Sequence, residues 1–219
     1  MKKERVMKTM KRASGTIRKR QIKAAALDIL SAEGVKNLST KNLASHVHLS
    51  EGTIFRHFHS KNEILFSILE DVENLLVTKL RKIASEASPA PERLHKFICF
   101  HLKYLFENHG VTILLFSEAA CQNNSELKTQ LNRIFLLIRQ SFEEIIKEGQ
   151  KAGWWNGSLS SHHVSSLYMG IPVSMNIEMY LSGNTFGYET FCEGISHLVL
   201  LLLTSSDKKM AFFEKNEIR

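Results

Sequence analysis

The stretch that decides the fold reads Leu38-Ser-Thr-Lys-Asn-Leu-Ala-Ser-His-Val-His-Leu-Ser-Glu-Gly-Thr-Ile-Phe-Arg-His-Phe-His-Ser-Lys61. Within it, Ser39 can cap a short helix that runs to about Val47, because a serine side chain at that place accepts a hydrogen bond from a free backbone amide. A second short helix is expected from about Ser50 to His57. Two short helices joined by a tight turn form a helix-turn-helix, whose second helix has the right size for the DNA major groove.

Longer helices flank this stretch on both sides. The segment from Thr16 to Glu33 carries Ile22, Ala26 and Ile29 on one helical face, and Gly34 supplies a C-terminal stop. A further helix is expected from about Lys61, marked by apolar residues at spacings of three and four. These residues are Ile64, Leu65, Ile68, Leu69, Val72, Leu75, Leu76 and Leu80.

The remainder of the chain also reads as helices. Its clearest break lies at Ser85 to Pro91, which holds two of the three prolines. Helical patterns then cover approximately residues 91–108, 111–120, 125–152, 160–182 and 187–205, with a turn at Gly153 to Gly157. We therefore expect an all-α fold, in which an N-terminal three-helix helix-turn-helix domain precedes a larger helical body.

The charge is distributed very unevenly. Residues 1–61 hold 14 Lys or Arg and 4 Asp or Glu, a balance of +10, whereas residues 62–219 hold 15 and 18, a balance of −3. Concentrated cations attract polyanions, so nucleic acid is the leading partner and an anionic membrane surface the lesser one. A solvated basic tail is the simpler interpretation for residues 2–12 taken alone. The apolar and charged fractions of 43% and 23% are those of an average globular protein.

The cysteine count and the hydropathy indicate a cytoplasmic protein. Cys99, Cys121 and Cys192 are widely separated and odd in number, which argues against a disulfide framework and favours reduced core residues. No secretory signal is evident, and the longest apolar run, Leu198 to Leu203, is too short to cross a bilayer. The histidines have no convincing metal spacing, so we expect no metal, no cofactor and no membrane partner.

The residue types of the second short helix suit a reader of DNA. Such a helix needs small or polar residues at its N-terminus, and cations or amides nearby that hold phosphates. The first need is met by Ser50, Glu51, Gly52 and Thr53. The second is met by Lys41, Arg56, His57 and Lys61.

These residues resemble the DNA-binding domain of the TetR/AcrR family of transcriptional regulators. The most specific part is Gly-Thr-Ile-Phe-Arg-His-Phe-x-Ser-Lys at residues 52–61, with the preceding helix in register, and the likeness covers residues 17 to about 70. The resemblance implies a sequence-specific DNA-binding regulator, expected to be a repressor that a small-molecule effector releases from a near-palindromic operator. It also implies the DNA-binding domain at 16–61 and an effector-binding and dimerisation domain at 62–206. The composition adds a basic tail at 1–15 and a polar tail at 207–219.

The same resemblance assigns roles to individual residues. Thr40 and Lys41 would contact the phosphate backbone, and His57 and Lys61 would clamp phosphates. Ser50, Glu51 and Thr53 would face base edges, with Gly52 allowing close approach. A cytosine amino group is a suitable donor to the Glu51 carboxylate. Equally, Glu51 can be a solvated acid that favours the N-terminus of its helix.

Two positions depart from the family pattern. His48 stands in the turn where glycine is usual, and histidine tolerates the left-handed backbone conformation at some cost. Phe55 replaces a tyrosine whose hydroxyl reaches a phosphate in the family. Phe55 therefore either keeps a role next to the DNA or only packs within the domain. One lost neutral hydrogen bond costs roughly 1 kcal/mol, too little to abolish binding.

The last two helical segments carry more apolar surface than one monomer needs, which predicts a homodimer. Its two helix-turn-helix domains, called heads below, would reach successive major grooves. Internal core is the alternative interpretation. The expected interface residues are Leu167, Gly170, Ile171, Met175, Ile195, Leu198, Val199 and Leu202.

Large apolar residues in the middle segments are compatible with an effector pocket, although ordinary helix packing explains each of them equally well. The candidate pocket residues are Phe100, Tyr104, Phe116, Phe135, Trp154 and Met169.

Two other classes of function compete with a DNA-binding regulator. The Ser-x-x-Lys spacing of Ser125 and Lys128 occurs in some acyl-transfer enzymes, but no accompanying acid, base or oxyanion group is recognisable, so an enzyme is not expected. The second alternative is a basic adaptor that binds nucleic acid or an anionic membrane surface non-specifically. Such an adaptor has no need of an ordered helix-turn-helix.

Overall fold

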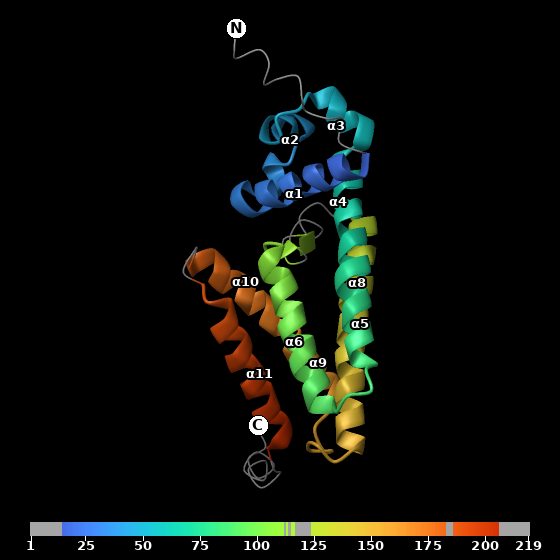
Figure 1. Ribbon diagram of the computed structural model, residues 1–219, viewed down its shortest axis with the longest axis vertical. Helices are drawn as coiled ribbons and strands as arrows, with labels where there is room; N and C mark the ends of the chain where they lie inside the picture. Colours follow the sequence, from blue (N-terminus) through green and yellow to red (C-terminus); the bar gives the residue numbers. More distant parts are fainter. Residues whose placement is uncertain (1–14, 112, 114, 117–123, 183–185, 206–219) are drawn as a thin grey trace, which may run out of the picture. The chain divides into compact units, whose positions relative to one another are not determined.

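The computed structural model describes residues 15–111, 113, 115–116, 124–182 and 186–205, and every regular element in this part of the chain is helical (Figure 1). The expected all-α fold is confirmed. Two compact units divide the chain between Glu70 and Asp71. The first unit extends past the boundary expected after Lys61, since Ile64 and Leu65 beyond it are fully buried.

The N-terminal unit contains α1 (Gly15–Glu33), a 3-10 turn (Val35–Asn37), α2 (Thr40–His46), α3 (Glu51–His57) and all but the last residue of α4 (Lys61–Asp71). The expected helices agree with these bounds to within about a residue. Apolar side chains from every one of its α-helices form the core of this unit. Its most deeply buried members are Ile22, Ala26, Ile29, Leu30, Leu43, Ile54, Phe58, Ile64 and Leu65.

The turn between α2 and α3 forms in spite of the missing glycine. His48 has a φ of 53°, in the left-handed region, and its amide donates to the Ser45 carbonyl at 3.2 Å. The next amide, of Leu49, donates to Ala44 at 2.9 Å. These bonds satisfy carbonyls at the end of α2, so the backbone preference of histidine is overcome by local hydrogen bonding.

A π-helical segment (Val72–Val77) follows α4 without a break, and α5 (Thr78–Ala84) continues from it. Sequence periodicity placed Leu75 on the buried stripe of this long helix, but Leu75 is 60% exposed. A π segment spaces its hydrogen bonds one residue wider than an α-helix, so it shifts the helical register. Val72 and Leu76 are buried as the periodicity indicates, and Val77 is buried in addition.

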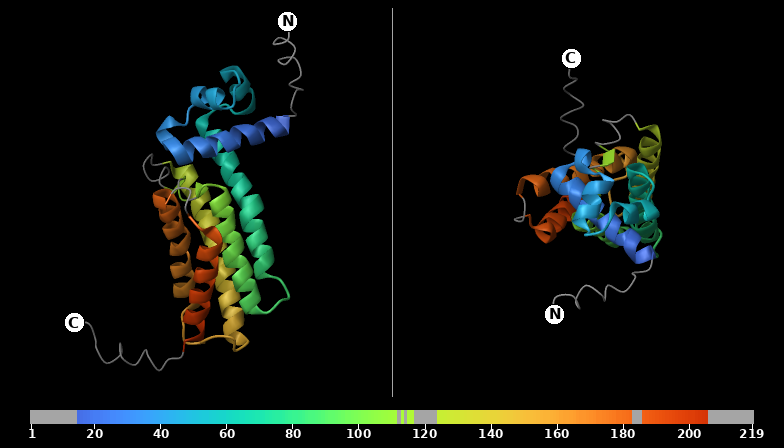
Figure 2. Two further views of the ribbon diagram at one scale, coloured as in Figure 1. Left: turned by 60° about the vertical axis from the view of Figure 1, so that its left-hand side comes forward. Right: turned by 90° about the horizontal axis from the view of Figure 1, so that it is seen from above.

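The C-terminal unit is a helical body built from α6 (Ala90–Glu107), α8 (Ser125–Lys151), α9 (Ser161–Tyr168), α10 (Gly170–Ser182) and α11 (Tyr188–Thr204). Its long helices run alongside one another in Figures 1 and 2. α6 packs against α5, α8, α10 and α11, and α8 packs also against α5 and α9. α6 is therefore central to the body.

The expected single helix over residues 160–182 is divided. α9 ends at Tyr168, Met169 forms a turn, and α10 begins at Gly170. Pro172 has no backbone N–H to donate to the Tyr168 carbonyl four residues earlier, so the helix cannot continue through this point.

Arg93 joins three elements of the body. Its side chain is almost fully buried, and its guanidinium donates to the Ala84 carbonyl at the end of α5 and to the Glu148 carboxylate on α8, at 2.5 and 2.6 Å. The two bonds engage both terminal nitrogens of the guanidinium, whereas its buried Nε has no hydrogen-bond partner. They also close the turn between α5 and α6 over the end of α8.

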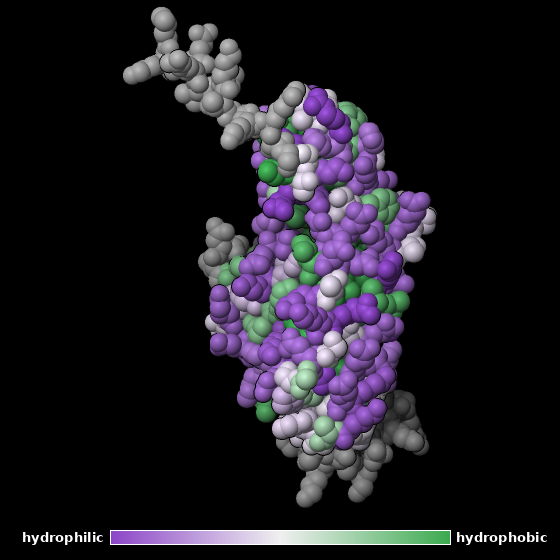
Figure 3. All heavy atoms as spheres, turned by 45° about the vertical axis from the view of Figure 1, so that its right-hand side comes forward, coloured by the Kyte–Doolittle hydropathy of each residue, from purple (hydrophilic) through white to green (hydrophobic). Residues whose placement is uncertain are grey.

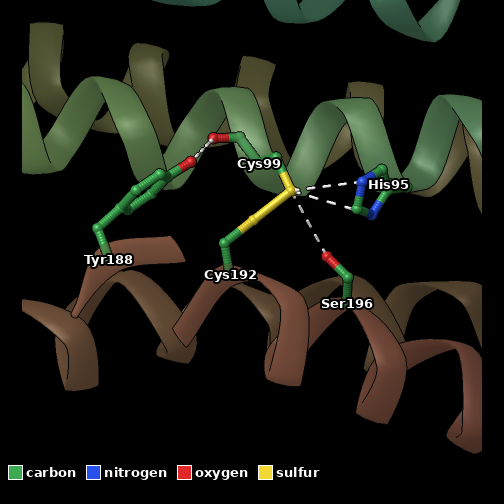
Figure 4. Close-up of a disulfide and its surroundings, with 5 residues drawn as sticks. All are labelled: His95, Cys99, Tyr188, Cys192 and Ser196. Atoms are coloured by element: carbon green, nitrogen blue, oxygen red, sulfur yellow. Dashed lines mark hydrogen bonds between the residues drawn. A yellow bond between two sulfur atoms is a disulfide. The ribbon is translucent and has the colours of Figure 1, made fainter. Parts of the chain in front are cut away.

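One expectation about the cysteines is wrong. Cys99 on α6 and Cys192 on α11 form a disulfide, with their Cα atoms 5.7 Å apart (Figure 4). Sequence spacing pointed away from this pair because 93 residues separate the two positions, and only the packing of α6 against α11 brings them together. Cys121 lies outside the described residues, as do most of the two expected tails and residues 117–120 of the expected helix at 111–120.

Among the described helices, none has the length and apolarity that crossing a bilayer requires. Hydrophilic side chains cover most of the face drawn in Figure 3, and hydrophobic ones show between them.

Candidate nucleic-acid interface

Serine side chains cap both short helices of the N-terminal unit. The Ser39 hydroxyl accepts from the Asn42 amide at 3.1 Å, and the Ser50 hydroxyl accepts from the Thr53 amide at 3.3 Å. The hydroxyls of Ser50 and Thr53 also lie 2.8 Å apart and share a hydrogen bond. The N-terminus of α3 therefore presents two oriented hydroxyls that can each donate or accept.

Thr40 and Glu51 connect the starts of α2 and α3. The Thr40 hydroxyl donates to the Glu51 carboxylate at 2.5 Å, across eleven positions of sequence. This bond fixes the distance between the two helix N-termini. Glu51 thus has a positioning role within the unit, beside the two roles that the sequence left open for it.

The expected DNA-contacting residues gather on α2, α3 and the start of α4. Thr40, Thr53, His57 and Lys61 are partly exposed. The remaining expected DNA-contacting residues are exposed: Lys41, Ser50, Glu51, Gly52, Phe55 and Arg56.

Gly52 and Phe55 both face away from the core of the unit. A Cβ added at Gly52 would meet no atom within 4 Å, so internal packing does not require glycine there. Phe55 is 46% exposed, whereas Phe58, three residues later, is only 1% exposed. An exposed aromatic ring beside exposed polar groups leaves space for a partner from outside the chain.

His57 lies in a positively charged neighbourhood that sequence order did not reveal. Burial and the nearby cations Arg56, Lys19 and Arg18 lower the pKa of His57 below its usual range. Lys19 also lies over the ring of Phe58, 5.2 Å from its centroid. The N-terminal part of α1 therefore adds cations to the end of α3, which strengthens the attraction for phosphate.

Lys61, the last of the expected phosphate-contacting residues, lies at the capped N-terminus of α4. The Ser60 hydroxyl accepts from the Glu63 amide at 3.1 Å, and the Glu63 carboxylate accepts from the His59 amide at 2.6 Å. This reciprocal arrangement satisfies amides at the start of α4. Lys61 is the first residue of that helix, next to the end of α3.

The residues expected at a dimer interface fall into two groups. Leu167, Gly170, Leu198 and Leu202 are exposed, and Ile171 and Ile195 are partly exposed. Met175 and Val199 are buried within the monomer. Leu167 lies on α9, and the other expected residues lie on α10 and α11. The structure adds five exposed apolar residues on α10 and α11: Val173, Ile177, Tyr180, Leu181 and Leu201.

Two of the expected pocket residues are in direct contact with each other. Phe116 and Phe135 contact edge to face, with ring centroids 6.3 Å apart. Phe100 and Met169 are partly exposed, and Trp154 is 53% exposed in the turn after α8. Tyr104 is partly buried, and burial together with the charge of Asp71 raises its pKa to about 12.

A different set of aromatic residues forms the centre of the body. The rings of Phe142 and Tyr168 stack with centroids 4.0 Å apart, and Phe97 packs edge-on against both. The Tyr168 hydroxyl shares a hydrogen bond of 2.9 Å with Nδ1 of His101. Sequence reasoning named neither His101 nor Tyr168 as members of such a group, although the spacing of Phe97 and His101 on one helix is a usable signal.

The buried histidine makes stability depend on pH. Burial lowers the pKa of His101 from 6.5 to about 3. Between these values the unfolded chain binds a proton at His101 that the folded chain does not, so the free energy of unfolding falls as the pH falls below 6.5. At pH 5 this contribution is roughly 2 kcal/mol.

His101→Asn keeps a hydrogen-bond partner for the Tyr168 hydroxyl. Between about pH 7.5 and pH 5, we expect its free energy of unfolding to fall by about 2 kcal/mol less than that of the wild-type protein. Urea unfolding at both pH values gives the comparison. Each protein is compared with itself at the two pH values, so packing that the substitution removes does not enter the difference. Equal pH-dependent losses in the two proteins would show that His101 does not carry the effect.

No cluster of three or more metal-binding side chains occurs in the part of the chain that the structure describes. Ser125 and Lys128 lie in the first turn of α8, where both are exposed. The candidate site is thus the surface around α3, with its hydroxyls, carboxylate and cations.

Family models match both units. The model for bacterial regulatory proteins of the tetR family matches residues 22–68, and the model for the C-terminal region of YsiA-like proteins matches residues 69–201. The nucleoid occlusion factor SlmA from Vibrio vulnificus strain YJ016 is 28% identical over 127 residues, which is 58% of this chain and 65% of that protein. The chain therefore spans less than two thirds of that relative's length.

Solved structures share the fold at low identity. The fatty acid degradation regulator FadR from Bacillus halodurans has a TM-score of 0.71 and 20% identity, covering 87% of this chain and 96% of that one. The transcriptional regulator FadR from Bacillus subtilis, solved in complex with stearoyl-CoA, has a TM-score of 0.66 and 22% identity, covering 85% and 97%.

Proposed function

Because the chain belongs to the TetR family of bacterial DNA-binding regulators, we propose that it is a homodimeric repressor that a small-molecule effector releases from a near-palindromic operator. Members of this family act by binding DNA and are not enzymes. The proposal adds the direction of regulation, the effector, the dimer and the residues that read the operator.

The single observation that carries the proposal is the N-terminus of α3. Ser50 and Thr53 offer oriented hydroxyls there, Gly52 leaves the backbone accessible, and the Thr40 bond to Glu51 fixes the position of the helix. An N-terminus of this kind reads base edges when the helix enters the major groove. Lys41, Arg56, His57 and Lys61 then bind phosphates on either side.

The exposed apolar face of α10 and α11 supports the dimer. Leucine, isoleucine and tyrosine side chains with exposed fractions from 38% to 81% lie on these two helices. An apolar surface of this kind on a globular protein usually binds another protein. A second copy of the chain is the partner that also supplies the second reading head of a near-palindromic operator.

The first effectors to test are long-chain acyl-CoA thioesters. This choice follows the structural likeness to the Bacillus subtilis regulator that was solved with stearoyl-CoA. An effector acts by binding preferentially to the conformation whose two heads do not fit the operator. Loss of operator binding on adding stearoyl-CoA is the expected result, and acetyl-CoA is the control for the CoA moiety alone.

The SlmA likeness raises nucleoid occlusion as a second candidate function, since that relative is a nucleoid occlusion factor. A repressor and a nucleoid occlusion factor both act on DNA. They differ in where the sites lie, so mapping the bound sites across the chromosome separates them. A few sites at promoters support a repressor, and many sites dispersed over the chromosome support an occlusion factor.

The test of operator reading is selection of bound duplexes from a random pool by the purified protein. We expect a near-palindromic winner. Thr53→Ala should reduce discrimination at the contacted base pair by about 1 to 3 kcal/mol, while Lys41→Ala should weaken all sequences alike and reduce the salt slope by about 1. Lys82→Ala, at an exposed lysine on α5, is the matched control and should change neither quantity. A pool with no enriched sequence would support a non-specific basic adaptor instead.

A further inference from the structure

The disulfide between Cys99 and Cys192 joins the central helix of the body to its last helix (Figure 4). Cys192 is only 3% exposed, whereas Cys99 is partly exposed. Cys99 is therefore the more accessible residue of the pair, while Cys192 is shielded between α11 and α6. This asymmetry is typical of a reactive cysteine with a resolving partner.

A potential base and a hydroxyl lie beside the Cys99 sulfur. Both ring nitrogens of His95, one turn earlier on α6, lie 3.8 and 3.9 Å from the Cys99 sulfur. The hydroxyl of Ser196 on α11 lies 3.8 Å from the same atom. An imidazole can take the thiol proton, and the imidazolium and the hydroxyl then stabilise the thiolate, which is the form that reacts with peroxides.

The location of the pair argues against a purely structural bond. If the proposed function holds, the protein acts on the chromosome, in a compartment that keeps thiols reduced. Disulfides that form there are mostly transient and redox-sensing. The reducing compartment follows from the proposed function, whereas the geometry of the pair does not depend on it.

We propose that Cys99 and Cys192 form a reversible redox switch, which a hydroperoxide closes into the disulfide. Two molecules of a small cellular thiol reopen it by exchange through a mixed disulfide, and they leave as a disulfide of their own. The Cys99 thiolate attacks the peroxide, the O–O bond breaks, and the departing alkoxide takes the proton from His95. Cys99 is then a sulfenic acid. Cys192 gives up its proton and attacks the Cys99 sulfur, the S–O bond breaks, and the departing hydroxide combines with that proton. Two thiols and one hydroperoxide thus become a disulfide, an alcohol and water.

Closing the switch fixes α11 to α6. The Tyr188 hydroxyl already donates to the Cys99 carbonyl at 2.7 Å, so the disulfide adds a covalent link to an existing contact. α11 also carries Leu198 and Leu201 of the exposed apolar face. The oxidised bond therefore restricts movement of a helix that the proposed dimer uses, and we infer that it changes operator affinity.

The chemical test uses the full-length, fully reduced protein and hydrogen peroxide. We expect a cross-linked peptide that contains residues 99 and 192, and its loss on adding glutathione. Cys192→Ser should accumulate a dimedone adduct at Cys99, whereas Cys99→Ser should give none at Cys192. A bond that persists in excess glutathione, or a dimedone adduct at Cys121 alone, would overturn the switch.

The role of His95 has its own readout. His95→Gln should slow oxidation about tenfold near neutral pH, and the difference from the wild-type protein should vanish above about pH 9, where thiols ionise without help. His197→Gln, at an exposed histidine on α11, is the matched control and should oxidise at the wild-type rate. A pH-independent effect of His95→Gln would show that His95 only supports local structure.

The regulatory step is measured with the selected operator. The affinities of the oxidised and reduced proteins should differ about fivefold or more, and Cys99→Ser and Cys192→Ser should remove that response. Reversible cross-linking without any operator binding would overturn the proposed function and leave the chemistry of the pair standing. Operator binding of equal strength in both states would overturn the regulatory step alone.

Discussion

Replacing Gly149 by alanine is expected to destabilise the protein by about 3 kcal/mol, although alanine is ordinarily the better helix former by about 1 kcal/mol. Gly149 lies near the end of α8, and a Cβ at this position would overlap the indole ring of Trp155. That ring is 5% exposed, and its Nε1 donates to the Ile146 carbonyl at 2.8 Å. The indole cannot move aside without losing this bond and its packing, so steric overlap outweighs helix propensity.

The measurement is chemical denaturation of the wild-type protein and Gly149→Ala under identical redox conditions. Gly194→Ala is the matched control, because a Cβ at this position in α11 meets no atom within 4 Å. The control should gain about 0.5 to 1 kcal/mol. In a Trp155→Ala background the penalty at Gly149 should disappear, because the obstructing ring is gone. A small effect of Gly149→Ala in the wild-type background would show that α8 and the following turn repack easily.

Much of the N-terminal unit was predictable because its signals are local. A capping serine precedes each short helix, and the Gly34 stop acts through its own backbone, with a φ of 79°. Even the departure at His48 was foreseeable, since its cost depends only on its own dihedral angles.

The body was less predictable because its departures depend on tertiary or helix-register effects. Apolar periodicity assumes an α-helix throughout, so the π segment placed Leu75 on the wrong side. Pro172 is a local signal that the long apolar pattern masked. The disulfide had no sequence signal at all, because it depends on how α6 packs against α11.

The candidate DNA interface shows the same limit. The sequence identified which residues α3 presents, since a short capped helix leaves little choice of face. It did not reveal that Thr40 holds Glu51 or that Lys19 and Arg18 lie near His57, because these contacts join different helices. Contacts between elements are where a single sequence carries the least information.

Charged substitutions on the exposed apolar face of α10 and α11 are expected to abolish dimerisation and to lower operator affinity about a hundredfold or more. Ile177 and Leu198 are 53% and 61% exposed, so aspartate at either position leaves the monomer core intact. In a dimer interface the same carboxylates would be buried without partners, which costs several kcal/mol. Two heads bind one operator much more tightly than a single head does, because the second head binds at a high effective concentration.

Analytical ultracentrifugation and operator titration of the double variant Ile177→Asp and Leu198→Asp provide the test. Leu75→Asp is the matched control, since Leu75 is 60% exposed but lies on the π segment, outside the apolar face of α10 and α11. We expect the control to remain dimeric with wild-type affinity. A double variant that stays dimeric would place the interface elsewhere on the molecule. A folded monomer that still binds the full operator tightly would mean that one DNA-binding unit is sufficient. The two halves of the near-palindromic operator would then not require two copies of the chain.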